Sequence, residues 1–185
     1  MTSEERPVTG KPRRQARLIL VLGGAASGKS QVALELAGRR GPRAFLATGQ
    51  ALDLEMKVRI KRHQATRSSD WETAEVPTDL AKWFINTGVN YQSIVLDCLT
   101  LWLSNIKGRR LHDRDVCVAT ADLVCAMRTS KARVVIVSNE LGMGLVPATK
   151  PVRAFRDLAG KVNQQMAAAA DEVYMAIAGL PMRLK

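Results

Sequence analysis

A glycine-rich turn between a strand-like run and a helix-like segment constrains this chain more than any other feature. Residues 18–22 are apolar, the motif Gly23-x-x-x-x-Gly28-Lys29-Ser30 follows them, and an amphipathic stretch comes next. This is the spacing of a P-loop, in the place where the motif requires it. Glycines let successive backbone N–H groups turn inward, so that the loop and the next helix N-terminus bind an anion together. The segment predicts nucleotide binding; the alternative is an ordinary glycine-rich turn.

Two elements of the sequence supply candidate ligands for a nucleotide and its metal ion. The loop residues expected to contact the nucleotide are Gly23, Gly24, Ala25, Ala26, Ser27, Gly28, Lys29, Ser30 and Gln31. Lys29 would reach the β and γ phosphates, and the Ser30 hydroxyl would help to hold Mg²⁺. Residues 94–97 form an apolar run that ends in Asp97, which is typical of a Walker B element that orients Mg²⁺. Without the P-loop, such an aspartate is as often a helix cap or a turn residue.

Strand and helix signals alternate along the chain. The expected strands are residues 18–22, 43–47, 93–96, 133–137, 172–177 and 182–184, and the expected helices are residues 30–40, 52–63, 80–86, 115–130 and 151–170. Short β-branched runs separated by helices indicate a parallel sheet covered on both faces. The expected fold is α/β, a RecA-like P-loop NTPase fold with a mostly parallel central sheet flanked by helices. We expect one domain, residues 18–185, after a flexible basic tail, residues 1–17.

Composition narrows the class of protein. A chain of 185 residues with 46% hydrophobic content suits one domain with a substantial core. No apolar run approaches the ~20 residues that span a bilayer, and no signal peptide is recognised, so we expect a cytoplasmic protein. Three cysteines without C-x-x-C spacing indicate reduced thiols. The net charge of +11 would suit nucleic acid, but only 4% of residues are aromatic and none interleave with a basic stretch, so a nucleic-acid partner is not favoured.

The chain has two histidines, His63 and His112. His63 continues a helical apolar stripe with Leu52, Met56 and Ile60, a position that usually holds a packing residue. Arg67 and Trp71 follow in the same region. The planar guanidinium of Arg67 suits bidentate contact with a phosphate. Trp71 could cover a nucleotide base or could simply pack in the core, and both alternatives stay open.

Five blocks of the chain resemble one enzyme family. They read GGAASGKS, ATGQALDLEMKVRIKRHQATRSSDWETAE, LDCLTLWLSN, SNELGMGLVP and FRDLAGKVNQQMAAAADEVYMAIAGLPMRLK, and they extend from residue 18 to the C-terminus. The family is the bifunctional adenosylcobinamide kinase/adenosylcobinamide-phosphate guanylyltransferase family. The resemblance implies two reactions. A nucleoside triphosphate, ATP or GTP, phosphorylates the aminopropanol hydroxyl of adenosylcobinamide. GMP then passes from GTP to that phosphate, giving adenosylcobinamide-GDP and pyrophosphate.

The resemblance also implies roles for particular residues. The family forms a GMP-histidine intermediate, and its histidine falls on His63; a neutral imidazole is a competent nucleophile. His112 lies outside the matching blocks and is expected at the surface. Residues that would line the nucleotide site are Thr48, Gly49, Gln50, Arg67, Ser68, Ser69, Asp70 and Glu75, with Asp97 in the Walker B place. Family members form homotrimers, and the same is expected here, with Mg²⁺ held by Ser30 and Asp97.

The chain departs from the family pattern at four places. Gln64 follows the histidine where a basic residue is common, and residues 148–150 replace a stretch that often carries an acidic residue and an asparagine. The segment between Asn105 and Asp115 is short, and residues 1–17 have no counterpart in the compact core of the family. Two other hypotheses remain. One is a single-activity P-loop kinase of another small hydroxyl substrate, with His63 structural. The other is a non-catalytic basic module that binds nucleotides or nucleic acid.

Overall fold

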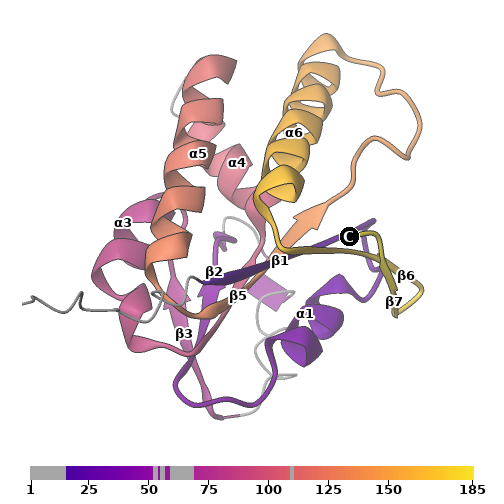
Figure 1. Ribbon diagram of the computed structural model, residues 1–185. Coiled ribbons are helices and arrows are strands. Elements are labelled where there is room, and N and C mark those ends of the chain that lie inside the picture. Colours follow the sequence, from indigo (N-terminus) through magenta and orange to yellow (C-terminus); the bar gives the residue numbers. More distant parts are fainter. Residues whose placement is uncertain (1–15, 52–53, 55–56, 59–68, 109–110) are drawn as a thin grey trace, which may run out of the picture.

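A seven-stranded sheet organises the molecule. The computed structural model describes residues 16–51, 54, 57–58, 69–108 and 111–185. The strands lie in the order β3-β2-β4-β5-β1-β6-β7, and all pairs are parallel except β6 with β7. Their bounds are β1 Arg17–Gly23, β2 Arg43–Ala47, β3 Trp71–Glu75, β4 Ser93–Asp97, β5 Arg133–Asn139, β6 Glu172–Ile177 and β7 Leu180–Arg183. The expected mostly parallel α/β architecture is confirmed (Figure 1).

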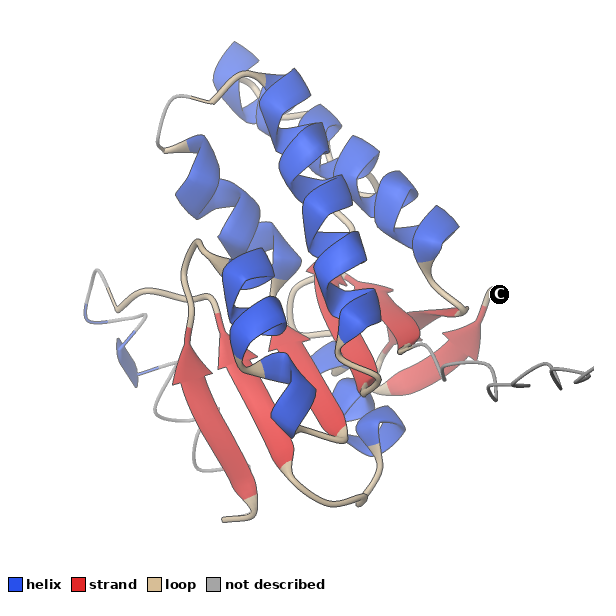
Figure 2. Ribbon diagram, turned by 60° about the vertical axis from the view of Figure 1, so that its left-hand side comes forward, coloured by secondary structure: helices blue, strands red, loops and turns tan. Residues whose placement is uncertain are grey.

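The helices cover the two faces of the sheet unequally. They are α1 Lys29–Ala37, α3 Leu80–Asn86, α4 Leu99–Lys107, α5 Asp113–Thr129 and α6 Lys150–Ala169, with a short 3-10 helix, Gly88–Asn90. Helices α3 to α6 pack together on one face, whereas α1 packs on the other (Figures 1 and 2). No helix within the described ranges has both the length and the apolar character to cross a membrane.

The central strands divide their side chains between two apolar cores. In β1, Leu18, Leu20 and Leu22 point to the core under α3 to α6, while Ile19 and Val21 point to the core under α1. This two-residue alternation is what a strand buried on both faces requires. Strands β4 and β5 follow the same rule, so the P-loop strand lies in the middle of the molecule and is held from both sides.

The bounds of several elements differ from those expected. Helix α1 ends at Ala37 rather than at residue 40, because Gly38 takes a positive φ of 74° there and its N–H bonds to Glu35 O. Strand β1 begins at Arg17, and Ala16 is buried, so these two residues of the expected tail belong to the fold; residues 1–15 lie outside the described chain. Strand β7 runs from Leu180 rather than from residue 182, because a tight hairpin at residues 178–179 starts it earlier.

Helix α4 and strand β3 were not expected, and neither was the short 3-10 helix. Helix α4 buries Leu99, Trp102, Leu103 and Ile106, which have the spacing of a helical apolar face. Strand β3 is an edge strand whose residues are exposed or half-buried, so it lacks the apolar run that marks the other strands. The expected helix over residues 52–63 lies largely outside the described residues.

Candidate nucleotide-binding site

The parallel register brings five chain segments to one edge of the sheet. Gly23 at the end of β1 lies beside Asn139, and Ala47 at the end of β2 lies between Glu75 and Asp97. Only β5 separates the P-loop strand from the strand that ends in Asp97. The carboxyl edge of a parallel sheet is where α/β proteins bind ligands. The structure therefore brings the P-loop, Thr48, Glu75 and Asp97 to the edge where a nucleotide site is expected.

The loop from Gly23 to Ser30 has the backbone of an anion cradle. Ala26 and Gly28 have positive φ angles of 54° and 85°, which turn the chain sharply before α1. Lys29 begins α1 and is buried, and its Nζ donates to the Gly24 carbonyl over 2.7 Å. The ammonium group thus lies across the loop, where it can meet phosphate oxygens. Gly23 has no space for a side chain, since a Cβ there would lie 2.5 Å from Ser27 Oγ and 2.7 Å from Ala176 O.

A hairpin from the far end of the chain supports this loop. The turn between β6 and β7 places Gly179 against the P-loop, where its N–H donates to Ser27 O over 2.9 Å. A Cβ on Gly28 would lie 2.8 Å from Gly179 Cα, so the two backbones touch. Gly179 itself has a φ of 82°, which only glycine adopts without cost. Sequence reasoning missed Gly179; the turn between two short strands was the available signal.

Thr48 fastens the end of β2 to the end of β4. Its hydroxyl donates to Cys98 O over 2.7 Å and accepts from Cys98 N over 2.8 Å, and its side chain is fully buried. Asn105 on α4 donates to Thr48 O over 2.8 Å. Thr48 was predicted to line the nucleotide site; the structure places it at the right edge, with its hydroxyl engaged by the backbone beside Asp97.

A second polar network holds the end of β5 against α6. Ser138 Oγ lies 2.7 Å from Asn163 Oδ1 and 3.2 Å from Thr100 Oγ1, and Asn163 Nδ2 donates to Asn139 O over 3.0 Å. These groups are buried or nearly so, and each has a partner, as buried polar groups require. None of these four residues was expected in the site. They fix the position of α6 beside the P-loop strand.

The Cys98 thiol lies close enough to the site to sense its charges. Burial raises the pKa of this thiol to about 11; the carboxylate of Asp97 adds to the rise, while the Leu101 N–H and the ammonium of Lys29 oppose it. The pKa of this thiol therefore depends on a charge at the end of β4 and on another at the start of α1. The thiol is protonated at neutral pH, so Cys98 is not a nucleophile. All three cysteines are free, as expected, and Cys125 is exposed.

The raised pKa of Cys98 predicts a loss of stability at alkaline pH. The pKa of the folded thiol is about 11, against an ordinary value of 9.0. Folding therefore favours the protonated form, and its contribution is present in full below pH ~9 and is lost as pH rises through about 11. Between pH 8 and pH 11 the free energy of unfolding should fall by up to ~2 kcal/mol more in the wild type than in Cys98→Ser. Urea unfolding without nucleotide or Mg²⁺ measures the free energy of unfolding at each pH, with Cys125→Ser as the control. An equal decrease of this free energy with pH in Cys98→Ser and in the wild type would contradict the prediction.

The remaining predicted residues fall into three groups. Gly49 and Gln50 follow Thr48 at the carboxyl edge, and Glu75 ends β3 there with its side chain exposed. Ser69 and Asp70 precede β3 and so lie at the opposite end of that strand, where Asp70 forms a salt bridge with Arg43. The structure does not bring these two to the P-loop. His63, Arg67 and Ser68 lie outside the described residues. His112 is exposed at the start of α5, as expected.

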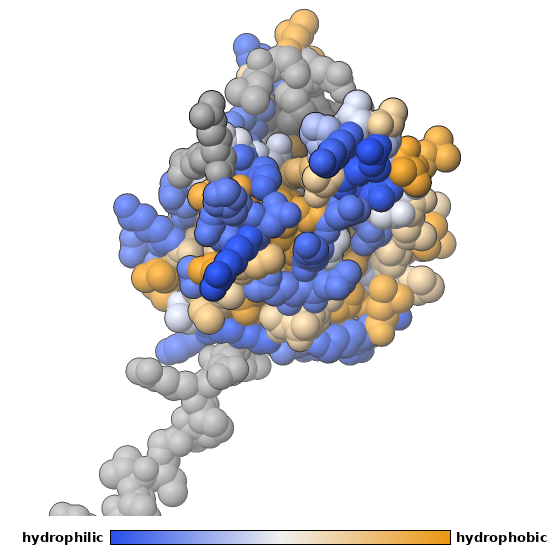
Figure 3. Space-filling view, turned by 90° about the horizontal axis from the view of Figure 1, so that it is seen from above, coloured by the Kyte–Doolittle hydropathy of each residue, from blue (hydrophilic) through white to orange (hydrophobic). Residues whose placement is uncertain are grey.

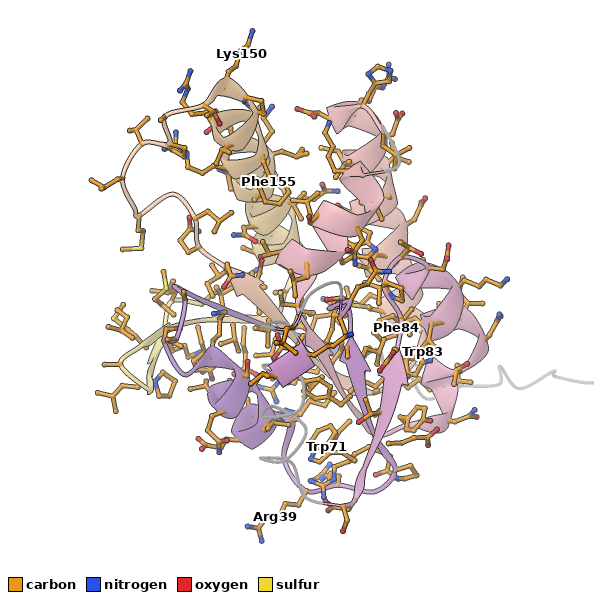
Figure 4. The ribbon with its side chains drawn as sticks, turned by 180° about the vertical axis from the view of Figure 1, so that it is seen from behind. Arg39, Trp71, Trp83, Phe84, Lys150 and Phe155 are labelled. Carbon is orange, nitrogen blue, oxygen red and sulfur yellow. The ribbon has the colours of Figure 1, made fainter. Side chains whose placement is uncertain are left out.

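Trp71 has a structural environment. It begins β3 at the amino edge of the sheet, is half-buried, and packs against the α1 core. The Arg43 guanidinium lies over its ring, 4.9 Å from the centroid, a cation–π contact. Figure 4 shows Trp71 at the end of the molecule near Arg39, far from Lys150. Of the two alternatives for Trp71, packing is the one that this structure supports.

The described residues fit a magnesium ion that is bound together with a nucleotide. Ser30, the second residue of α1, and Asp97, at the end of β4, offer a hydroxyl and a carboxylate oxygen at the same sheet edge. Oxygen ligands of this kind suit Mg²⁺, which takes its other ligands from phosphates and water. Within the described part of the chain no three His, Cys, Asp or Glu residues cluster as a metal site by themselves.

The P-loop, the charged edge around it and the sheet order define the chain as a P-loop NTPase. A KaiC-like protein of Pyrococcus horikoshii has the same fold, with a TM-score of 0.50 and 10% identity over 87% of this chain and 71% of that one. The family model described as cobinamide kinase/cobinamide phosphate guanyltransferase matches residues 19–184. The chain belongs to this family.

Curated relatives from the same family align with this chain over nearly their whole length. The bifunctional adenosylcobalamin biosynthesis protein CobU of Escherichia coli is 38% identical over 181 residues, which cover 91% of this chain and 99% of that protein. The bifunctional adenosylcobalamin biosynthesis protein CobP of Pseudomonas aeruginosa is 40% identical over 171 residues, which cover 90% of this chain and 96% of that protein. The family that the sequence blocks indicated is thereby confirmed.

Proposed function

We propose that this protein is a bifunctional adenosylcobinamide kinase and adenosylcobinamide-phosphate guanylyltransferase. It phosphorylates the aminopropanol hydroxyl of adenosylcobinamide with a nucleoside triphosphate, and it then transfers GMP from GTP to the new phosphate. The products are adenosylcobinamide-GDP and pyrophosphate. The observation that carries the proposal is a P-loop with Lys29 drawn across it, in a chain whose family match extends from residue 19 to residue 184.

The geometry of the described site suits the phosphate chemistry of both steps. The loop N–H groups, Lys29 and the N-terminus of α1 converge where a triphosphate would lie, and their positive character offsets charge as phosphoryl or nucleotidyl groups move. When Mg²⁺ is bound it neutralises part of the phosphate charge, and Ser30 and Asp97 are the residues that would hold it. ATP and GTP are the proposed substrates of the loop.

His63 is the proposed nucleophile of the second step. Its imidazole nitrogen attacks the α-phosphorus of GTP, a P–N bond forms, and the bond to pyrophosphate breaks. A phosphate oxygen of adenosylcobinamide phosphate then attacks the same phosphorus, and the P–N bond breaks. This role rests on the family resemblance, because His63 lies outside the described residues. The proposal also includes a cytoplasmic, homotrimeric enzyme.

A product assay tests the proposal directly. Purified protein is incubated with adenosylcobinamide, Mg²⁺ and GTP labelled at either the α or the γ phosphate, and corrinoid products are separated. We expect γ label in an early corrinoid phosphate and α label in the final product. Transfer of γ label alone would leave the single-activity kinase. Transfer of neither label, with salt-sensitive binding of polynucleotides, would leave the non-catalytic module.

A further inference from the structure

A pocket of about 680 Å³ lies between α6 and the chain that leaves β5. Leu22, Glu140 and Gly142 line it on one side, and Arg156, Gly160 and Asn163 of α6 line it on the other. It adjoins the P-loop, because Leu22 directly precedes Gly23 and Glu140 N donates to Gly23 O over 3.1 Å. Nothing in the described nucleotide site uses this space.

The pocket and α1 lie on opposite faces of the sheet. Helix α1 packs in one core and α6 packs in the other, and the P-loop crosses the edge between them. A triphosphate held by the loop and the N-terminus of α1 would therefore be approached from the α6 side by a second substrate. Displacement at phosphorus places the attacking and leaving oxygens roughly in line, so an acceptor must come from the side opposite the leaving group.

The polar residues that line the pocket suit the aminopropanol arm of adenosylcobinamide. This arm ends in a hydroxyl before the first reaction and in a phosphate after it. Arg156 and Lys161 are cationic, and a guanidinium suits bidentate contact with phosphate. Glu140 and Asp157 offer carboxylates that accept from hydroxyl or amide N–H groups. Glu140 Oε1 already accepts from Gly142 N over 2.9 Å, which holds that side chain at the pocket. Arg156 contacts the neighbouring Asp157 at 3.3 Å.

One of the residues that line the pocket is a glycine within a helix, Gly160 of α6. A Cβ built on Gly160 would meet nothing within 4 Å, so packing does not require glycine there. Glycine in a helix interior costs about 1 kcal/mol relative to alanine, so the space beside Gly160 has a stability cost. Gly160 lies one helical turn from Arg156 and from Gln164, which also line the pocket.

Exposed apolar side chains follow Gly142, one of the residues that line the pocket. Met143, Leu145 and Val146 are 76%, 96% and 72% exposed on the segment that joins β5 to α6. Arg153 of α6 fastens the end of this segment by donating to Pro147 O and Ala148 O over 2.9 and 2.8 Å. In Figure 3, seen from above, apolar side chains lie beside strongly polar ones at the margin of this face. Exposed apolar groups beside a charged pocket suit a ligand with a polar arm and a large apolar body.

We propose that this pocket is the corrinoid acceptor site. It binds the aminopropanol arm, and then its phosphate, between Arg156 and Glu140, while Met143, Leu145 and Val146 contact the edge of the macrocycle. The inference rests on the proposed function and adds the residues that would recognise its acceptor. These residues position the acceptor and take no part in forming the GMP adduct.

Two substitutions test the site in different ways. Gly160→Phe fills the pocket, and Arg156→Gln removes the guanidinium. Each should weaken binding of adenosylcobinamide phosphate, measured by equilibrium dialysis, and raise its KM by about tenfold or more, the loss typical of a hydrogen bond to a charged group. Each should leave unchanged the yield of GMP adduct from α-labelled GTP. The matched controls are Ala121→Phe and Arg114→Gln on the exposed side of α5.

The outcomes separate this inference from the proposed function. Unchanged corrinoid binding and KM in both variants would overturn the acceptor site while the enzyme activity stands. Loss of the GMP adduct in folded variants would also overturn it, because the pocket would then serve the nucleotide. If the wild type itself formed neither the GMP adduct nor a guanylylated corrinoid, the proposed function would fail. Direct binding of adenosylcobinamide to the wild type and to Gly160→Phe would still decide whether the pocket holds a corrinoid.

Discussion

Replacing His63 with alanine is expected to abolish the GMP adduct and to lower guanylyl transfer by about 10⁴-fold or more, since loss of a covalent nucleophile removes the whole two-step route. Phosphorylation of adenosylcobinamide should continue, because that step needs the P-loop and the acceptor hydroxyl but no imidazole. The measurement is incubation with α-labelled GTP, denaturation, and treatment with acid or alkali. A phosphoramidate is expected to be labile in acid and stable in alkali.

The second histidine supplies the control. His112 is exposed at the start of α5, and its backbone N–H donates to Asp115 Oδ2 over 3.0 Å. His112→Ala should retain the adduct and both activities. An adduct of undiminished yield in His63→Ala would show that another residue carries the GMP, and the two-reaction proposal would then need a different nucleophile. A variant that loses the kinase step as well would point to a structural role for His63.

The parts of the fold that the sequence predicts well are those in which local pattern and burial agree. Residues 18–22 and 134–137 are apolar throughout because their strands are buried on both faces, and both strands were expected at nearly their observed bounds. Strand β3 was missed because it lies at the sheet edge, where burial imposes little pattern. Helix α4, in contrast, carries a helical apolar spacing at Leu99, Trp102, Leu103 and Ile106, which does predict a helix.

The candidate site was predictable only where a short motif carries its mechanism. Lys29, Ser30 and Asp97 were identified because spacing and chain position define their chemistry, and the structure brings their segments to one edge. The contact of Gly179 with Ser27 joins residues 152 positions apart in the chain, and no local pattern encodes such a pairing. No local pattern encodes the hydrogen bond between Ser138 and Asn163 either, because a long-range polar pair depends on how a helix packs on the sheet.

Replacing Lys29 with methionine is expected to lower both the kinase and the guanylyltransferase rates by about 10²–10³-fold, the usual cost of losing one preorganised charge on a transferring phosphate. Both rates should fall together, because a single P-loop would hold the triphosphate for both reactions. The GMP adduct should fall with them, since His63 can attack only a nucleotide that the loop retains. Methionine keeps most of the buried aliphatic stem, so the free energy of unfolding should change by no more than about 1.5 kcal/mol.

Three measurements make this prediction sharp. Steady-state rates of both reactions give the loss of each activity in Lys29→Met. Lys82→Met, on the exposed surface of α3, controls for the loss of a positive charge. The pKa of the Cys98 thiol reports independently that the charge beside it has been removed. The Lys29 ammonium lowers the pKa of that thiol, so Lys29→Met should raise it further. Loss of the kinase rate alone, with normal adduct formation, would mean that GTP for the second reaction is held elsewhere. In that case the carboxyl edge of the sheet would serve only phosphorylation, because one triphosphate site cannot lose its lysine for one reaction and keep it for the other.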